Sequence, residues 1–133
     1  MLLGNIYEEN EDYNNAIQCY KNAIVKDKKF YKAYYNLGYI YATQKDYIKA
    51  LTHYNTALEY QPDNAYIIYN IGCMYLKLHE VKKANKEFIK AINKQNNVSL
   101  FYYNLAYTYK LMGNKTKAEE CITHYNTLVA EGN

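Results

Sequence analysis

An eight-residue segment recurs in this chain at a fixed interval, and that interval limits what the chain can fold into. YYNLGYIY at 34–41 returns as IYNIGCMY at 68–75 and as YYNLAYTY at 102–109, with the same spacing at each step. The segment MLLGNIY at 1–7 is the same pattern with its start missing. The interval is 34 residues. A repeat of 34 residues cannot bury an apolar face alone, so successive repeats stack against one another. The 133 residues therefore predict about four copies of one small unit.

Matched positions in the copies keep the size of their side chains. So many matches in one register exclude coincidence, and each is expected to mark a packing position. The ladders are Gly4, Gly38, Gly72 and Ala106; Tyr7, Tyr41, Tyr75 and Tyr109; Ala16, Ala50, Ala84 and Ala118; Leu3, Leu37, Ile71 and Leu105; and Ala23, Ala57 and Ala91, broken by Tyr125.

Each copy is predicted to hold two helices joined by a polar turn. In the second copy, apolar residues of 34–41 follow the i, i+3, i+4, i+7 spacing of one helix face. The polar segment TQKD at 43–46 breaks this pattern, and Asp46 stands where it can cap a second helix. A second apolar stripe runs over 47–58. The segment QPDN ends it with Pro62, the only proline of the sequence.

Close packing of the helices explains why the small residues recur at these positions. Gly38 and Ala50 are predicted to lie where the two helices of one copy cross, and Ala57 where the second helix meets the next copy. A longer side chain there would push the helix axes beyond the roughly 8–10 Å of close packing. Tyr41 and Tyr54 are expected to fill the space beside these crossings.

This pattern resembles the tetratricopeptide repeat family, which has the same 34-residue period and the same order of small and large residues. The resemblance covers essentially the whole chain. It departs at the repeat ends, where the expected proline survives only as Pro62, and in the fourth repeat, where Ala106 replaces glycine. The resemblance implies an all-α, right-handed α-solenoid of about four helix-turn-helix units. They form a single domain, with repeats at 1–30 (N-terminally truncated), 31–64, 65–98 and 99–132.

Members of this family are protein-binding scaffolds, and the first helix of each repeat lines their inner, concave surface. The resemblance therefore implies a protein or peptide partner, no cofactor and no enzymatic activity. Carried over position by position, the inward-facing places of the four repeats fall on Asn5; Lys32, Tyr35, Asn36 and Tyr39; Tyr66, Tyr69, Asn70 and Cys73; and Tyr103, Asn104, Tyr107 and Lys110.

One row of these residues is a ladder of asparagines, Asn36, Asn70 and Asn104, one in each of three successive repeats. A primary amide both donates and accepts hydrogen bonds, so it can pair with the C=O and N–H of an extended peptide whatever its side chains. Asparagine is also common at this place in the family's average sequence. Peptide contact and a role in the fold are therefore both open for this ladder.

A second row beside it holds Tyr35, Tyr69 and Tyr103. Tyrosine offers a large, stiff contact area with a polar tip, which suits a protein interface. Tyr35 and its neighbour Tyr39 are expected to point away from the packing face and to have no packing role. Because Lys, Asn, Tyr and Ile have AT-rich codons, nucleotide bias is the competing account of the many tyrosines.

The two-carboxylate clamp that some family members use for the C-terminal EEVD tail of chaperones is not predicted. It needs two asparagines and three cations on the inner helices. The matching places are Met1, Asn5, Asn36, Tyr66 and Asn70, which supply both asparagines and no cation. Without the cations, charge-assisted bonds to a carboxylate cannot form.

Composition argues against several other classes of protein. All 16 basic residues are lysine, and the net charge of +3 is too small to predict nucleic-acid binding. A helical-repeat RNA binder is a further alternative that this charge supports little, and the related RNA-binding repeat family has a slightly longer period. No apolar run approaches the roughly 20 residues that span a bilayer, and the start does not resemble a secretion signal. Three widely separated cysteines favour a reducing compartment such as the cytoplasm.

No catalytic or metal site is predicted. Cys121 and His124 can share a helix face, but two ligands do not make a structural zinc site. No nucleophile–base pair stands out, and glycines spaced a whole repeat apart form no phosphate loop.

Two functions stay open at this point. The chain is either a scaffold that holds a peptide or helix in a Tyr/Asn-lined groove, or an architectural segment of a longer solenoid. The first repeat lacks its opening residues and no polar capping helix follows the fourth, so we expect a fragment of a longer array. Its end faces are expected to favour end-to-end self-association at high concentration.

Overall fold

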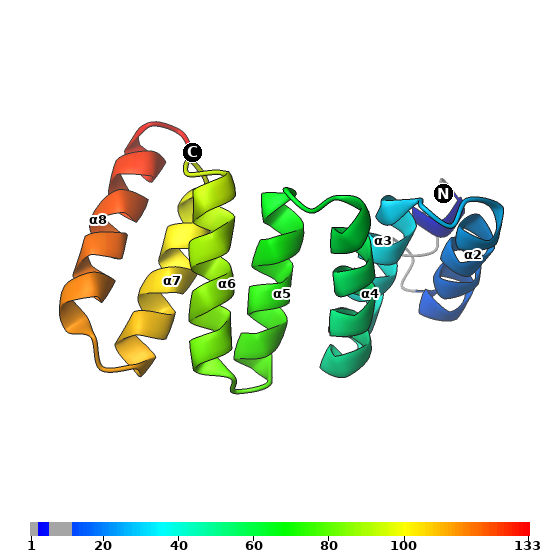
Figure 1. Ribbon diagram of the computed structural model, residues 1–133, viewed down its shortest axis with the longest axis horizontal. Coiled ribbons are helices and arrows are strands. Elements are labelled where there is room, and N and C mark those ends of the chain that lie inside the picture. The colour runs from blue at the N-terminus through cyan, green and yellow to red at the C-terminus, as the bar shows by residue number, and fades with distance from the viewer. Residues whose placement is uncertain (1–2, 6–11) are drawn as a thin grey trace. The chain divides into compact units, whose positions relative to one another are not determined.

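The computed structural model describes residues 3–5 and 12–133, and these residues form helices and turns with no strand. The predicted positions Met1 and Tyr7 lie outside the described residues. Residues 3–5 are helical. The further helices, which Figure 1 labels, are α2 (Tyr13–Lys26), α3 (Tyr31–Thr43), α4 (Tyr47–Tyr60), α5 (Ala65–Lys77), α6 (Val81–Lys94), α7 (Ser99–Leu111) and α8 (Lys115–Ala130). The all-α class and the tandem helix-turn-helix order are confirmed.

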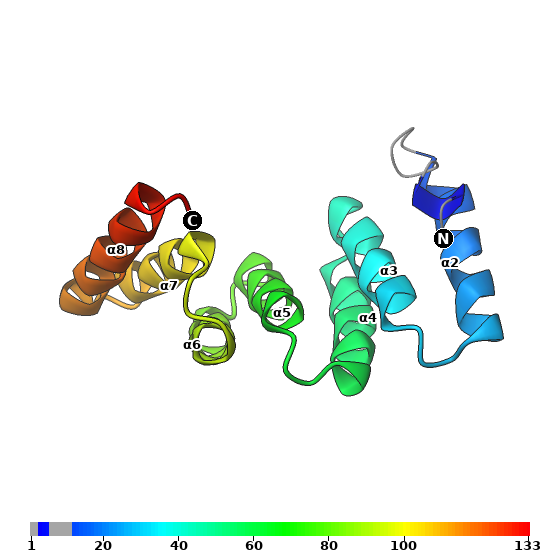
Figure 2. The same ribbon diagram turned by 90° about the horizontal axis from the view of Figure 1, so that it is seen from above.

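The chain forms two compact units, Met1–Pro62 and Asp63–Asn133. In the first unit α3 and α4 pair as a helical hairpin, and α2 packs against α3. In the second unit α5 pairs with α6, α7 pairs with α8, and α6 also packs against α7. The two hairpins of the second unit lie side by side in both views (Figures 1 and 2). The single domain, its repeat boundaries and the right-handed superhelix stay predictions.

Three of the four second helices begin at a side chain that caps the helix: Asp12 for α2, the predicted Asp46 for α4 and Asn114 for α8. The Glu80 side chain before α6 makes no capping bond. The Asp46 carboxylate accepts a hydrogen bond from the Lys49 amide at 3.2 Å, and the Asn114 side chain accepts one from the Lys117 amide at the same distance. A side-chain acceptor at this place satisfies one of the unpaired amides of a helix start. The predicted turn at 43–46 and the predicted cap at Asp46 are thereby confirmed.

The turn before each of the last three capping positions contains a left-handed residue at the same place in the repeat. Lys45, His79 and Gly113 have φ values of 63°, 62° and 80°. Glycine adopts this conformation without cost, whereas a side chain makes it unfavourable by about 1–2 kcal/mol. The backbone of each hairpin therefore requires the same turn, and only the third copy has the residue that suits it best.

The glycines of the repeat lie under aromatic rings of the second helix. A Cβ built on Gly38 would stand 2.7 Å from the Tyr54 ring, and one on Gly72 would stand 2.7 Å from the Phe88 ring. Gly4 meets the Tyr20 ring in the same way, at 3.0 Å. Real Cβ atoms essentially never stand as close as 2.7 Å to another atom, so the rings of Tyr54 and Phe88 require glycine at Gly38 and Gly72, and the contact at Gly4 is tight. The predicted close crossing is confirmed.

This pairing explains the exception in the fourth copy. The ring positions Tyr20, Tyr54 and Phe88 continue in the next repeat as Ile122. An isoleucine side chain is smaller than a ring, and Ala106 takes the place of glycine opposite it. The two departures from the pattern are therefore one change of packing rather than two.

We expect Gly72→Ala to lower the free energy of unfolding of the second unit by about 1 kcal/mol. Overpacking costs about 1–3 kcal/mol, and the better helix propensity of alanine offsets about 1 kcal/mol of it. Urea denaturation followed by circular dichroism measures the loss. In a Phe88→Ile background, which copies the Ala106/Ile122 pair, the same substitution should be neutral or stabilising. Equal losses in both backgrounds would contradict the ring–glycine account.

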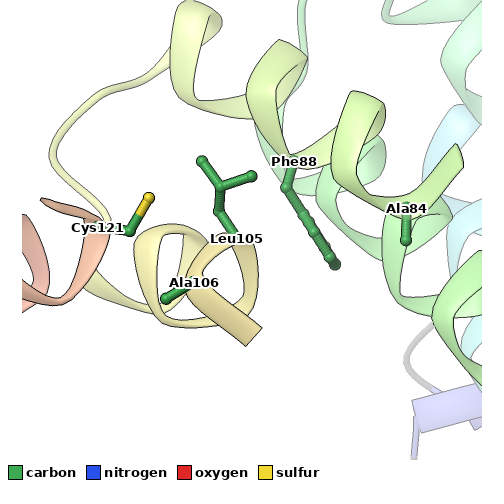
Figure 3. Packing of buried hydrophobic residues seen from close by; sticks show 5 residues of the cluster. All are labelled: Ala84, Phe88, Leu105, Ala106 and Cys121. Carbon is green, nitrogen blue, oxygen red and sulfur yellow. The ribbon is translucent and has the colours of Figure 1, made fainter. Parts of the chain in front are cut away.

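The core of the second unit joins its two hairpins. Figure 3 shows Ala84 and Phe88 of α6 on one side of Leu105 and Ala106 of α7, and Cys121 of α8 on the other side. Phe88 is fully buried, with 0% of its surface exposed. Burial of this apolar surface, at roughly 25 cal/mol per Å², is what holds α7 against the α5–α6 hairpin.

A buried polar pair crosses the same contact. The Asn85 amide of α6 donates to the Thr108 hydroxyl of α7 at 3.0 Å, and that hydroxyl donates to the Leu105 carbonyl at 2.7 Å. Both side chains are buried. Because buried polar groups need partners, this pair fixes the position of α7 along α6.

Candidate functional site

The structure divides the predicted inner residues into an exposed and a half-buried set. The half-buried residues are Tyr35, Asn36, Tyr69, Asn70, Cys73 and Asn104. The exposed ones are Asn5, Lys32 and Tyr39 in the first unit and Tyr66, Tyr103, Tyr107 and Lys110 in the second.

The tyrosine ladder takes part in packing. The Tyr35 ring lies 5.5 Å from the Tyr54 ring, centroid to centroid, so the expectation that Tyr35 has no packing role is wrong. Tyr69 contacts Phe88 at 5.6 Å and stacks on Phe101 of α7 at 4.9 Å. Aromatic pairs at these distances add about 0.5–1.5 kcal/mol to the area they bury. These tyrosines hold helices together, whatever else they contact.

Tyr103 occupies the same place in the last hairpin but remains half exposed. Its ring contacts Tyr125 of α8 at 5.4 Å, and 50% of its surface is open to solvent. Phe101 stacks on the Tyr69 ring, and Tyr69 is less exposed than Tyr103. Of this ladder, Tyr103 therefore presents the largest free contact area.

Two asparagines of the ladder use their amides inside the fold. The Asn70 amide donates to the Tyr66 carbonyl at 2.8 Å. The Asn104 amide donates to the Leu100 carbonyl at 3.2 Å and to the Tyr69 hydroxyl at 2.8 Å, which ties α7 to α5. Asn36 makes no side-chain hydrogen bond to any described residue. The ladder is thus not a uniform row of free amides.

The thiol of the half-buried Cys73 has low reactivity. Burial raises the pKa of its thiol, and the Tyr69 hydrogen bond and Lys77 lower it only in part. Burial also raises the pKa of the Cys121 thiol, with Glu120 acting in the same direction. Because the thiolate is the nucleophile and the metal ligand, a raised pKa makes both cysteines less reactive at neutral pH.

The exposed residues of α7 converge on a pocket of about 810 Å³ between α7 and α8. Its lining is mostly apolar, and it gathers three of the predicted residues, Tyr103, Tyr107 and Lys110. The residues that line it are Tyr103, Ala106, Tyr107, Lys110 and Leu111 of α7 and Ala118 and Ile122 of α8. We call this surface the α7–α8 groove.

Sequence reasoning missed four members of the α7–α8 groove, Ala106, Leu111, Ala118 and Ile122. Leu111 and Ile122 have 53% and 38% of their surface exposed, which is unusual for aliphatic side chains so close together. The signal was present in the sequence, because Ala118 belongs to a packing ladder and Ile122 follows the ring positions. Leu111 and Ile122 thus offer apolar surface to solvent beside the predicted tyrosines.

Other kinds of site find no support in the described residues. No group of three or more His, Cys, Asp or Glu side chains stands close enough to hold a metal ion in that part of the chain. His124 stacks on the Tyr102 ring at 5.0 Å, which accounts for its position beside Cys121. None of the described helices is long and apolar enough to cross a membrane.

Comparison with protein-family models identifies the family of the repeat pattern. Tetratricopeptide repeat models match residues 31–64 and 100–128, and a further TPR repeat model matches residues 4–45. The chain belongs to the tetratricopeptide repeat family. Membership supports a role as a protein-interaction scaffold, the usual role of these repeats, and disfavours an enzyme. No curated protein sequence matches the chain.

Solved structures share the fold at low identity. A crystal structure of MamA is 22% identical, covers 98% of this chain and 76% of its own, and has a TM-score of 0.91. A double mutant titled MamA RS-1 ArsTM is 18% identical over 99% of this chain and 74% of its own, with a TM-score of 0.90. MamA 41-end from Desulfovibrio magneticus RS-1 is 18% identical over 98% of this chain and 73% of its own, with a TM-score of 0.88. At these identities the likeness shows the fold alone.

Proposed function

We propose that this chain is a scaffold that binds a peptide or helical segment of a partner protein on its tyrosine- and asparagine-lined inner helices. The α7–α8 groove is the main site. The observation that carries the proposal is the convergence of Tyr103, Tyr107 and Lys110 on one apolar pocket of about 810 Å³. Ligand sites are concave, mostly apolar and rimmed by a few polar groups, and this groove has that composition.

The predicted residues in this groove have the chemistry of binding hot spots. Tyr103 and Tyr107 have 50% and 45% of their surface exposed. Tyrosine is enriched among the few interface residues that carry most of the binding free energy, because it buries a large area at little entropic cost. Lys110 adds a cation to the lining of the groove, which favours an acidic partner. The remaining exposed residues, Lys32, Tyr39 and Tyr66, are secondary candidates in their own units.

The test is a comparison of partners captured from lysate of the source cells. The double variant Tyr103→Ala/Tyr107→Ala should lose its captured partner at least about tenfold, since a hot-spot side chain contributes about 2 kcal/mol or more. The matched control is Leu100→Ala/Val129→Ala, two side chains on the same helices that are equally exposed, at 49% each, and lie outside the groove. Equal capture by all three proteins would refute the assignment of the site.

The same variants separate the alternative, an architectural segment that associates with copies of itself. Under that alternative, Tyr103→Ala/Tyr107→Ala would change the sedimentation coefficient of the purified chain and leave no partner-specific loss. Ile122 and Leu111 are the exposed apolar residues that such self-association would bury. A purified wild-type chain that sediments as a monomer supports the scaffold.

A further inference from the structure

A second pocket of the second unit lies against another face of α7. It has a volume of about 250 Å³ and is lined by residues of α6, α7 and α8. From α7 it takes Tyr102, Leu105 and Tyr109, which are spaced three and four residues apart and share one helix face. This pocket shares no lining residue with the α7–α8 groove, so the two sites are separate. We call this second surface the α6–α8 pocket.

One part of the α6–α8 pocket is apolar. Ile89 and Ile92 of α6 line it together with Leu105 and Cys121, which are buried. All four belong to the core cluster around Phe88 or pack against it. Since the core holds these residues in place, the apolar surface is formed before any ligand binds, as in most sites for small ligands.

Two opposite charges of α8 border this apolar surface without pairing with each other. Lys117 and Glu120 both line the pocket, and both are exposed. Residues three apart on a helix have Cβ atoms about 5–6 Å apart, which is close enough for an ion pair. Among the described residues, however, neither side chain forms one. The Lys117 ammonium lies 5.6 Å from the centroid of the Tyr109 ring instead. Both charges are therefore available to a ligand that brings an opposite charge to each.

The Cys121 thiol is affected by both of these charges. Burial is the main cause that raises its pKa, Glu120 raises the pKa further, and Lys117 lowers it. Because Cys121 lines the pocket, a ligand bound there would be close to the same cation and the same anion.

The size and the charges of the α6–α8 pocket limit the class of ligand. Its volume lies below the range of about 300–1,000 Å³ that is typical of sites for drug-sized molecules, so the ligand is small. A wholly apolar ligand would desolvate Lys117 and Glu120 without pairing them, which is unfavourable. A simple anion would meet the like charge of Glu120, and a simple cation that of Lys117. A zwitterion with a short apolar chain pairs with both charges and covers the apolar surface.

We propose that the α6–α8 pocket binds a free aliphatic α-amino acid. Its carboxylate pairs with Lys117, its ammonium pairs with Glu120, and its side chain contacts Ile89 and Ile92. The ammonium and carboxylate of an amino acid stand on one carbon atom, which matches two opposite charges on neighbouring turns of α8. A residue inside a peptide chain lacks both charges and fits less well. The inference goes beyond the proposed function, because the α7–α8 groove takes no part in it.

Saturation-transfer difference NMR with L-leucine and the 133-residue chain tests the proposal. We expect saturable binding, with the strongest transfer to the leucine methyl groups that face Ile89 and Ile92. Lys117→Met and Glu120→Gln should each weaken binding at least about tenfold, since each removes a charge-assisted contact. Lys115→Met and Glu119→Gln are the matched controls, because they change exposed residues of the same kinds on α8 outside the pocket. Both controls should bind L-leucine as the wild type does.

Two analogues of leucine separate the two contacts from an effect on folding. Isocaproate lacks the ammonium and leucinamide lacks the carboxylate, so the wild type should bind each at least about tenfold more weakly than L-leucine. Glu120→Gln should lose the preference for L-leucine over isocaproate, and Lys117→Met should lose the preference over leucinamide. The comparison of the three ligands on the wild type does not depend on the folding of any variant.

Absence of saturable L-leucine binding to the wild type would overturn the proposal. Equal binding of L-leucine and isocaproate by the wild type would overturn it as well, since the ammonium would then have no partner. The same loss of binding in the Glu119→Gln control as in Glu120→Gln would show that the ligand lies outside this pocket.

Discussion

Replacing Phe88 by alanine is expected to destabilise the second unit by about 3–5 kcal/mol, the cost of removing a fully buried ring and leaving a cavity. The Phe88 ring is 0% exposed, lies on Gly72 and contacts Tyr69 as well as the α7 core. Both hairpins of the unit lose a contact at once. Urea denaturation followed by circular dichroism measures the loss, and hydrogen exchange of amides 63–133 shows whether it is confined to this unit.

The control for this substitution is Leu100→Ala. Leu100 stands on α7 with 49% of its surface exposed, so its truncation should change the free energy of unfolding by less than about 0.5 kcal/mol. A loss below about 1 kcal/mol for Phe88→Ala would mean that the two hairpins are not held by this ring.

Thr108→Val is expected to cost about 1–3 kcal/mol although it preserves the shape of the side chain. Valine cannot accept the Asn85 hydrogen bond, and the buried amide loses its 3.0 Å partner. A buried donor without a partner costs its full desolvation free energy. Chemical denaturation of the single variant gives the magnitude.

A double-mutant cycle checks the physical reason. Asn85→Leu removes the stranded amide, so Asn85→Leu/Thr108→Val should recover part of the loss that Thr108→Val causes. Additive losses in the double variant would show that the pair is not coupled, and that Thr108 acts only through its bond to the Leu105 carbonyl.

The fold could be predicted from the sequence because its causes are local. The 34-residue period predicts the helices, and Asp46 predicts a helix start that its bond to Lys49 confirms. The small residues predict close crossings, which the ring over Gly72 confirms. The pairing of Ala106 with Ile122 could also have been predicted from the sequence. The fourth repeat replaces both the glycine and the aromatic ring that face each other in the earlier repeats.

The site was only partly predictable, because its members depend on contacts between repeats. The exposed positions Tyr103, Tyr107 and Lys110 were predicted as inner residues, and the groove gathers them. Tyr69 stands at the same repeat position as Tyr103, but Phe101 covers it. Whether a ladder residue is free or packed depends on what the next helix places on it, and a position-by-position transfer treats both alike.

The most direct test of the account is lysine footprinting of the chain with its captured partner. An amine-reactive reagent labels the exposed lysines, and mass spectrometry measures the protection of each one on binding. The account predicts that Lys110, at the α7–α8 groove, is strongly protected, while Lys82 and Lys86 on α6 react as in the free chain. Protection of Lys82 and Lys86 with Lys110 left reactive would contradict it.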